Sequence, residues 1–139
     1  MKKSFLIAVL LLLMGTAYGQ TLQKGAVIAV NSFEFTLNPD VTMNQFLDFY
    51  MNKYIPEMEK NFPGVKEIVV SGNRGEHKNQ VGSITYFESV QVRDKYYPVE
   101  DGDISPAAQA AQQKMEAINL ELNKYVVNAK RTYTDWIVK

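Results

Sequence analysis

Few side chains in this sequence could do chemistry. It contains one histidine, His77, and no cysteine, which excludes disulfides, thiolate metal sites and a catalytic cysteine. A catalytic triad or a histidine-rich metal site would have to depend on His77 alone. Because His77 lies in the polar, glycine-containing stretch 72–80, we expect it to be a solvated loop residue.

A second candidate is the acidic stretch formed by Glu100, Asp101 and Asp103, whose oxygens could bind calcium. The stretch lacks the spacing and the distal bidentate acid of an EF-hand, so we expect a solvated loop. The sequence contains no Walker motif, GxSxG elbow or dinucleotide fingerprint. It also has no histidine on a predicted helix that could ligate haem. We therefore predict no metal and no cofactor.

The remaining candidates are aromatic side chains accompanied by a few charges. The residues predicted to bind a ligand are Tyr50, Tyr54, Tyr86, Arg131, Tyr133 and Trp136. In one interpretation they are ordinary core residues. In the other they line a small pocket between a sheet and its helices, where tyrosine hydroxyls and one charge orient a largely apolar ligand. Arg131 and Asp135, four apart on one predicted strand, point the same way and form either a pair or two unconnected charges.

An amphipathic helix over residues 42–64 must position two of these tyrosines. Thr42 and Gln45 form a capping box at its start, and Pro63-Gly64 ends it. Its apolar stripe recurs at three- and four-residue steps and consists of Met43, Phe46, Leu47, Tyr50, Met51, Tyr54, Ile55 and Met58. Pro56 lies inside the helix and predicts a kink near residues 52–56.

That kink gives Tyr54 two interpretations. Pro56 frees the carbonyl of Asn52 and widens the turn, so Tyr54 should line a pocket if one exists. Alternatively, Tyr54 is one more member of the apolar stripe, with its hydroxyl in solvent.

Four segments have the composition of strands: 25–37, 65–74, 81–92 and 126–138. Residues 26–30 are apolar at every position, which indicates burial of the first strand on both faces. Residues 72–80 are predicted to form a hairpin connection and 93–103 a loop with exposed tyrosines. Ser105 and Pro106 open a second helix. The order β-α-β-β-α-β predicts a ferredoxin-like α+β domain, with a four-stranded antiparallel sheet and two helices on one face.

The first twenty residues have a different character. Lys2 and Lys3 precede an apolar run, and Ala17-Tyr18-Gly19 leads to a possible cut before Gln20, which predicts a secretory signal peptide over residues 1–19 and a mature domain over 20–139. The alternative is an uncleaved anchor, but the apolar run of about thirteen residues is well short of the roughly 20 needed to span a bilayer.

Composition narrows the remaining classes of function. The 139 residues are 46% hydrophobic and 22% charged, as in one ordinary globular domain. Without the signal peptide the chain is mildly acidic, so we predict no nucleic-acid partner. A short signal without disulfides is typical of a bacterial periplasmic or secreted protein.

The first helix carries a recognisable set of residues: Phe46, Tyr50, the step Tyr54-Ile55-Pro56 and the run Phe62-Pro63-Gly64-Val65. In these residues it resembles the first helix of the dimeric α+β barrel superfamily, which includes stress-responsive barrel domains, EthD-like proteins and antibiotic-biosynthesis-type monooxygenases. The resemblance implies a homodimer in which two sheets face each other, which would cover the second face of the first strand. Many EthD-like sequences have a histidine at the position of Tyr54, so the resemblance does not bring a histidine-dependent activity with it.

We therefore predict an exported, homodimeric α+β barrel protein that binds a small apolar or aromatic ligand without catalysis. One alternative is a cofactor-independent oxygenase-like enzyme in which a tyrosine or Arg131 orients the substrate. Another is a structural or interaction module with a filled barrel. Few groups titrate near neutral pH, which favours binding over acid–base catalysis. An enclosed pocket lined by polar groups would support the first two interpretations, and a packed interior the third.

Overall fold

The computed structural model describes residues 22–98, 102 and 104–139. The predicted signal peptide and the acidic residues Glu100, Asp101 and Asp103 lie outside these residues. In chain order the elements are β1 (Val27–Leu37), α2 (Met43–Phe49), η1 (Tyr50–Tyr54), α3 (Ile55–Asn61), β2 (Val65–Ser71), β3 (Val81–Phe87), α4 (Val90–Tyr96), α5 (Pro106–Lys114), α6 (Glu116–Leu122) and β4 (Val126–Ile137).

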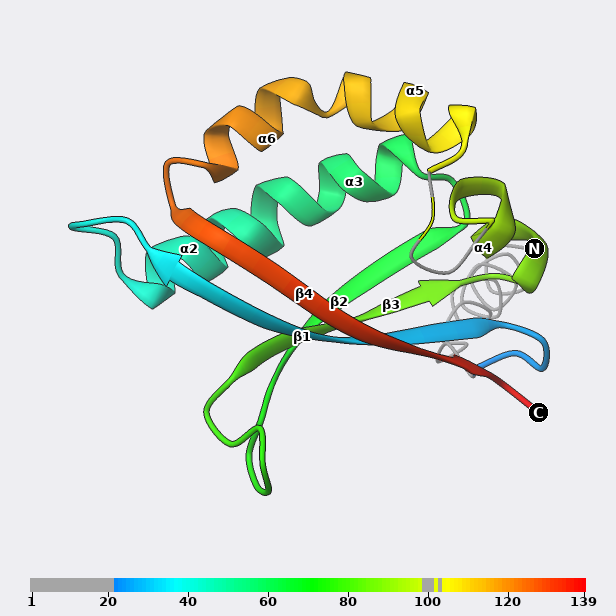
Figure 1. The fold of residues 1–139 in the computed structure, drawn as a ribbon, viewed down its shortest axis with the longest axis horizontal. Coiled ribbons are helices and arrows are strands. Elements are labelled where there is room, and N and C mark those ends of the chain that lie inside the picture. The colour runs from blue at the N-terminus through cyan, green and yellow to red at the C-terminus, as the bar shows by residue number, and fades with distance from the viewer. Residues whose placement is uncertain (1–21, 99–101, 103) are drawn as a thin grey trace, which may run out of the picture.

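The sheet has the strand order β2-β3-β1-β4, and all neighbouring strands are antiparallel. Figure 1 shows α2, α3, α5 and α6 together over one face of this twisted sheet. With the chain order, this arrangement is the ferredoxin-like fold, and the predicted fold class is confirmed. No helix in the described ranges is both long and apolar enough to cross a membrane.

The first helical segment begins and breaks where the sequence predicts. The Thr42 N–H donates to Gln45 Oε1 at 2.8 Å, and the Gln45 N–H donates to Thr42 Oγ1 at 3.3 Å. The predicted break takes the form of the π-helical turn η1, in which the Ile55 N–H bonds the Tyr50 carbonyl. Pro56 causes this widening because it has no N–H and its ring pushes against the carbonyl one turn earlier.

The segment after β3 differs from the prediction. The third strand ends at Phe87 instead of continuing to residue 92, and Val90 and Val92 belong to helix α4. Ser89 caps this helix, since its Oγ accepts from the Val92 N–H at 3.2 Å. Tyr96, predicted to be exposed in a loop, is fully buried in α4.

The sheet register defines two faces of different character. The rows facing the helices include Asp135–Ala29–Thr85–Glu67 and Tyr133–Asn31–Ser83–Val69. The rows on the opposite face, here called the open face, include Trp136–Ile28–Tyr86–Lys66 and Thr134–Val30–Ile84–Ile68. The first strand is therefore apolar on both faces near its start, as predicted, but the described residues place helices over only one of these faces.

Two clusters hold the helices onto the sheet. The main core lies at one end and contains Val27, Met58, Phe62, Val65, Phe87, Tyr96, Ala108, Ala111 and Met115. At the other end, Phe35 packs on Phe46 with ring centroids 4.9 Å apart, and Phe49 stacks on Tyr125 at 4.4 Å. Between these clusters the helices leave a cavity over the middle of the sheet.

Candidate ligand-binding site

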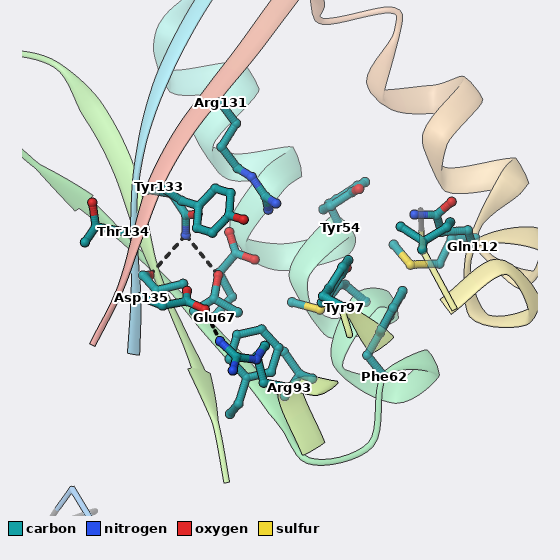
Figure 2. Close-up of a pocket in the computed structure, with 18 of the residues that line it drawn as sticks. Tyr54, Phe62, Glu67, Arg93, Tyr97, Gln112, Arg131, Tyr133, Thr134 and Asp135 are labelled. Carbon is teal, nitrogen blue, oxygen red and sulfur yellow. Dashed lines mark hydrogen bonds and ion pairs between the residues drawn. The ribbon is translucent and has the colours of Figure 1, made fainter. Parts of the chain in front are cut away.

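The cavity lies between the helix-facing side of the sheet and the helices, and has a volume of about 960 Å³ (Figure 2). Strands β1, β2, β3 and β4 supply its floor, and η1, α3, α5 and α6 supply side chains from the other side. The segment after α4 contributes Tyr97, Pro98 and Gly102. This volume lies in the range of about 300–1,000 Å³ typical of small-molecule sites.

The centre of the floor is polar although it is buried. The side-chain amide of Asn31 donates to Ser83 Oγ at 3.1 Å and to Thr85 Oγ1 at 3.0 Å. All three residues are buried, and these bonds offset the cost of placing polar groups there. A hydroxyl that accepts such a bond still has its own proton to donate, so Thr85, which lines the cavity, can offer that proton to a ligand.

The π-helical turn brings two tyrosines to the cavity. Their rings stack with centroids 5.0 Å apart and planes 11° from parallel. The hydroxyl of Tyr50 donates to Glu67 Oε1 on strand β2 at 3.0 Å. Tyr54 is also among the lining residues, which is the position that the kink at Pro56 predicts for it.

Burial controls the protonation of the cavity tyrosines. Burial raises the pKa of Tyr50 far above its ordinary value, and the negative charge of Glu67 raises it further. The pKa of Tyr54 and that of Tyr97 are also raised, in each case chiefly by burial. All three hydroxyls are therefore neutral hydrogen-bond donors near neutral pH.

The two arginines of the cavity have different surroundings. Arg93 Nη1 lies 2.6 Å from Asp135 Oδ2 (Figure 2), and Arg93 also bonds Asp94. Arg131 lies 5.6 Å from the ring centroid of Tyr133, and it is in none of the ion pairs found among the described residues. Arg131 and Asp135 thus share a face, as predicted, but are unconnected charges.

The structure separates the six residues predicted from sequence into two groups. Tyr50, Tyr54, Arg131 and Tyr133 line the cavity. Tyr86 and Trp136 lie on the open face, because each is one position along its strand from a residue that faces the helices. The structure therefore brings four of the six predicted residues together and places Tyr86 and Trp136 on the opposite face of the sheet.

Sequence reasoning missed several lining residues, namely Asn31, Glu67, Thr85, Arg93 and Tyr97. The sequence does contain an indication for two of them, Glu67 and Asn31. Glu67 lies between Val65 and Val69 at alternate positions of a strand, and Asn31 directly follows an apolar run. A polar residue at a core-facing strand position marks either a buried network or a site.

The other chemical candidates lie outside the cavity. His77 is exposed in the connection between β2 and β3, with Nδ1 2.8 Å from Gln80 Oε1. Within the ranges that the structure describes, no group of three or more histidine, cysteine, aspartate or glutamate side chains could hold a metal ion.

Comparison with known proteins adds little to this geometry. No protein-family model matches the chain, and no curated protein matches it in sequence. One similar solved structure is that of a dimeric protein of unknown function with a ferredoxin-like fold from Bacteroides fragilis, at 16% identity and a TM-score of 0.40. The alignment covers 84% of this chain and 99% of that one. Because that likeness is distant, the fold is identified by the strand order of this chain, which is ferredoxin-like.

Proposed function

We propose that this protein binds a small, largely apolar or aromatic molecule in the cavity, without catalysis. The observation that carries this proposal is the unfilled volume of about 960 Å³ between sheet and helices. The space is partly open to solvent, since Arg131 and Tyr133 in its lining are exposed. Clefts of this size between packed elements are where proteins usually bind small molecules.

The lining has the composition that such a ligand requires. Its apolar part includes Met58, Phe62, Phe87, Ile104 and Met115. Its polar part is at least as large and includes tyrosine hydroxyls, Asn31, Thr85, Glu67 and two arginines. Small-molecule sites combine apolar walls with polar groups that fix the orientation of the ligand. The π-helical turn supports the proposal. Such turns are rare in proteins, and those that occur are often at functional sites.

The protonation state of the tyrosines favours binding over catalysis. A general base needs a pKa near the working pH, whereas burial raises the pKa of Tyr50, Tyr54 and Tyr97. The Tyr50 proton is already donated to Glu67, so the hydroxyls of Tyr54 and Tyr97 are the ones that orient a ligand as donors, and none of the three removes its protons. The oxygenase-like alternative would need a group that accepts a proton from the substrate, and these tyrosines do not supply it.

The proposal is tested by fluorescence titration of residues 20–139 with N-phenyl-1-naphthylamine, a neutral aromatic probe. Ala29 lies on the cavity floor, so Ala29→Leu should fill space and weaken binding about tenfold. Val30→Leu, one residue away on the open face, is the matched control and should bind as the native protein does. If Ala29→Leu and Val30→Leu both bind the probe as tightly as the native protein, and both keep its melting temperature, the probe does not bind in the cavity.

We also propose that the protein is a homodimer whose two copies meet through the open face. This face carries Ile28, Val30, Ile68, Val70, Ile84, Tyr86 and Trp136. Trp136 is 61% exposed and Ile68 is 59% exposed in the single chain. Antiparallel sheets that face water normally alternate apolar and polar residues, and contiguous exposed apolar surface marks an interaction site. A twofold pairing of two such faces covers both copies.

Export remains part of this proposal and rests on the sequence pattern of residues 1–19. Intact-mass measurement of the protein made in a bacterial host should give a chain that starts at Gln20. A full-length mass would contradict cleavage.

A further inference from the structure

We propose that the ligand carries an acidic group and that Arg131 binds it. This inference rests on the proposed function, because it concerns the same cavity. It adds the chemical class of the ligand: an apolar or aromatic body with an anionic group, such as a carboxylate, at one end.

The first observation is the placement of Arg131. It lies on β4, opposite Phe33 in the register and two residues before Tyr133, on the side of the sheet that faces the helices. Figure 2 shows its guanidinium pointing from the strand toward the space between Tyr133 and Tyr54. Arg131 and Asp135 are the charged lining residues of this strand, and of these two only Asp135 is ion-paired among the described residues.

The second observation is the contrast with Arg93. Both arginines line the cavity, but Arg93 donates to the carboxylates of Asp94 and Asp135, which more than compensate its charge. Arg131 contacts an aromatic ring instead, with its guanidinium carbon 5.6 Å from the Tyr133 centroid. Packing on a ring holds the guanidinium plane and leaves its N–H groups available. A carboxylate is the partner that such a planar donor fork binds in two-pronged geometry.

The third observation is the set of donors near the arginine. The hydroxyl of Tyr54 and that of Tyr97 belong to lining residues. Burial raises the pKa of Tyr97, and the positive charge of Arg131 partly offsets that rise; the same charge acts on Tyr54. Arg131, Tyr54 and Tyr97 all line the same cavity, and Figure 2 shows the guanidinium directed toward the side of Tyr54, so a guanidinium and neutral hydroxyls face the same space.

Glu67 limits where the acidic group can lie. Its carboxylate also lines the cavity, and one oxygen accepts the Tyr50 hydroxyl. Its negative charge repels an anion, so the acidic end belongs beside Arg131 and away from strand β2. The apolar body then extends toward Phe62, Phe87 and Met115.

A matched pair of ligands tests this inference. 1-Naphthaleneacetate and 1-naphthaleneacetamide have nearly the same size and differ in charge, and each can displace N-phenyl-1-naphthylamine from the native protein. We expect the acid to bind about tenfold more tightly than the amide, as a charge-assisted hydrogen bond in a partly solvated site provides. Arg131→Gln should reduce the ratio of the two dissociation constants to about one, and Arg131→Lys should keep part of it.

Arg74→Gln is the control, because Arg74 is exposed in the β2–β3 connection and its loss changes the net charge equally. This variant should keep the native ratio. If the acid and the amide bind the native protein equally, or if the preference survives in Arg131→Gln, the inference is wrong while the proposed function stands. If the naphthylamine probe itself does not bind the native protein, both are wrong.

Discussion

The hydroxyl of Tyr50 and the carboxylate of Glu67 lie 3.0 Å apart and join the π-helical turn to the cavity floor. The turn exists because Pro56 prevents a regular α-helix there. It points Tyr50 at strand β2, while the stacked Tyr54 remains beside the cavity. One local backbone irregularity thus helps to fix the wall of the candidate site.

This contact predicts different effects for two similar substitutions. Tyr50→Phe leaves the Glu67 carboxylate without its donor and should lower the free energy of unfolding by about 1–2 kcal/mol. Tyr54→Phe, whose hydroxyl bonds no side chain within the described ranges, should lower it by less than about 0.5 kcal/mol. Urea unfolding followed by circular dichroism measures both. Equal losses would show that the Tyr50–Glu67 bond contributes nothing in solution.

The buried tyrosines predict a loss of stability at alkaline pH. The pKa of Tyr50, Tyr54 and Tyr97 is raised in the folded state, chiefly by burial, so the unfolded chain releases these protons first. Their contribution is therefore fully present below pH about 10 and decreases above it, by up to about 1.4 kcal/mol per pH unit for each tyrosine.

Urea unfolding between pH 8 and 11 measures this slope. The triple variant Tyr50→Phe/Tyr54→Phe/Tyr97→Phe should have a shallower slope above pH 10 than the native protein. Identical slopes in the two proteins would mean that these hydroxyls are exposed to solvent when the chain is folded.

The open face predicts the state of association. The native protein should sediment as a dimer at micromolar concentration, and Ile68→Lys should weaken the dimer at least tenfold by placing a charge in the apolar interface. Ser71→Lys adds the same charge to the same strand on the other face and should remain dimeric. A monomeric native protein would contradict the proposed dimer.

Local signals allowed much of the fold to be predicted from sequence. Three of these signals act within one helical turn: Thr42 with Gln45, Pro56, and Ser105 with Pro106. The structure has a helix start at the first and third and the π-helical turn next to the second. Residue preference predicts a third strand that is too long, because Val90 and Val92 favour strands, while the capping bond of Ser89 favours a helix. At this position the hydrogen bond from the Val92 N–H to Ser89 Oγ determines the structure, and the strand preference of valine does not.

The site was less predictable because it depends on strand pairing. A shift of one residue moves a side chain to the other face of a sheet, and this separates Thr85 from Tyr86 and Asp135 from Trp136. The residue pattern within these strands does not identify the face that the helices cover. Asn31 and Glu67 come together only through the order β2-β3-β1, which joins segments far apart in the sequence.

The most direct test of the central claim is the position of a bound probe. A crystal structure of residues 20–139 with N-phenyl-1-naphthylamine should show the probe between the sheet and the helices, against Tyr54 and Phe87. A cavity closed by side chains, or a probe bound only on the open face beside Trp136, would contradict the proposed binding function.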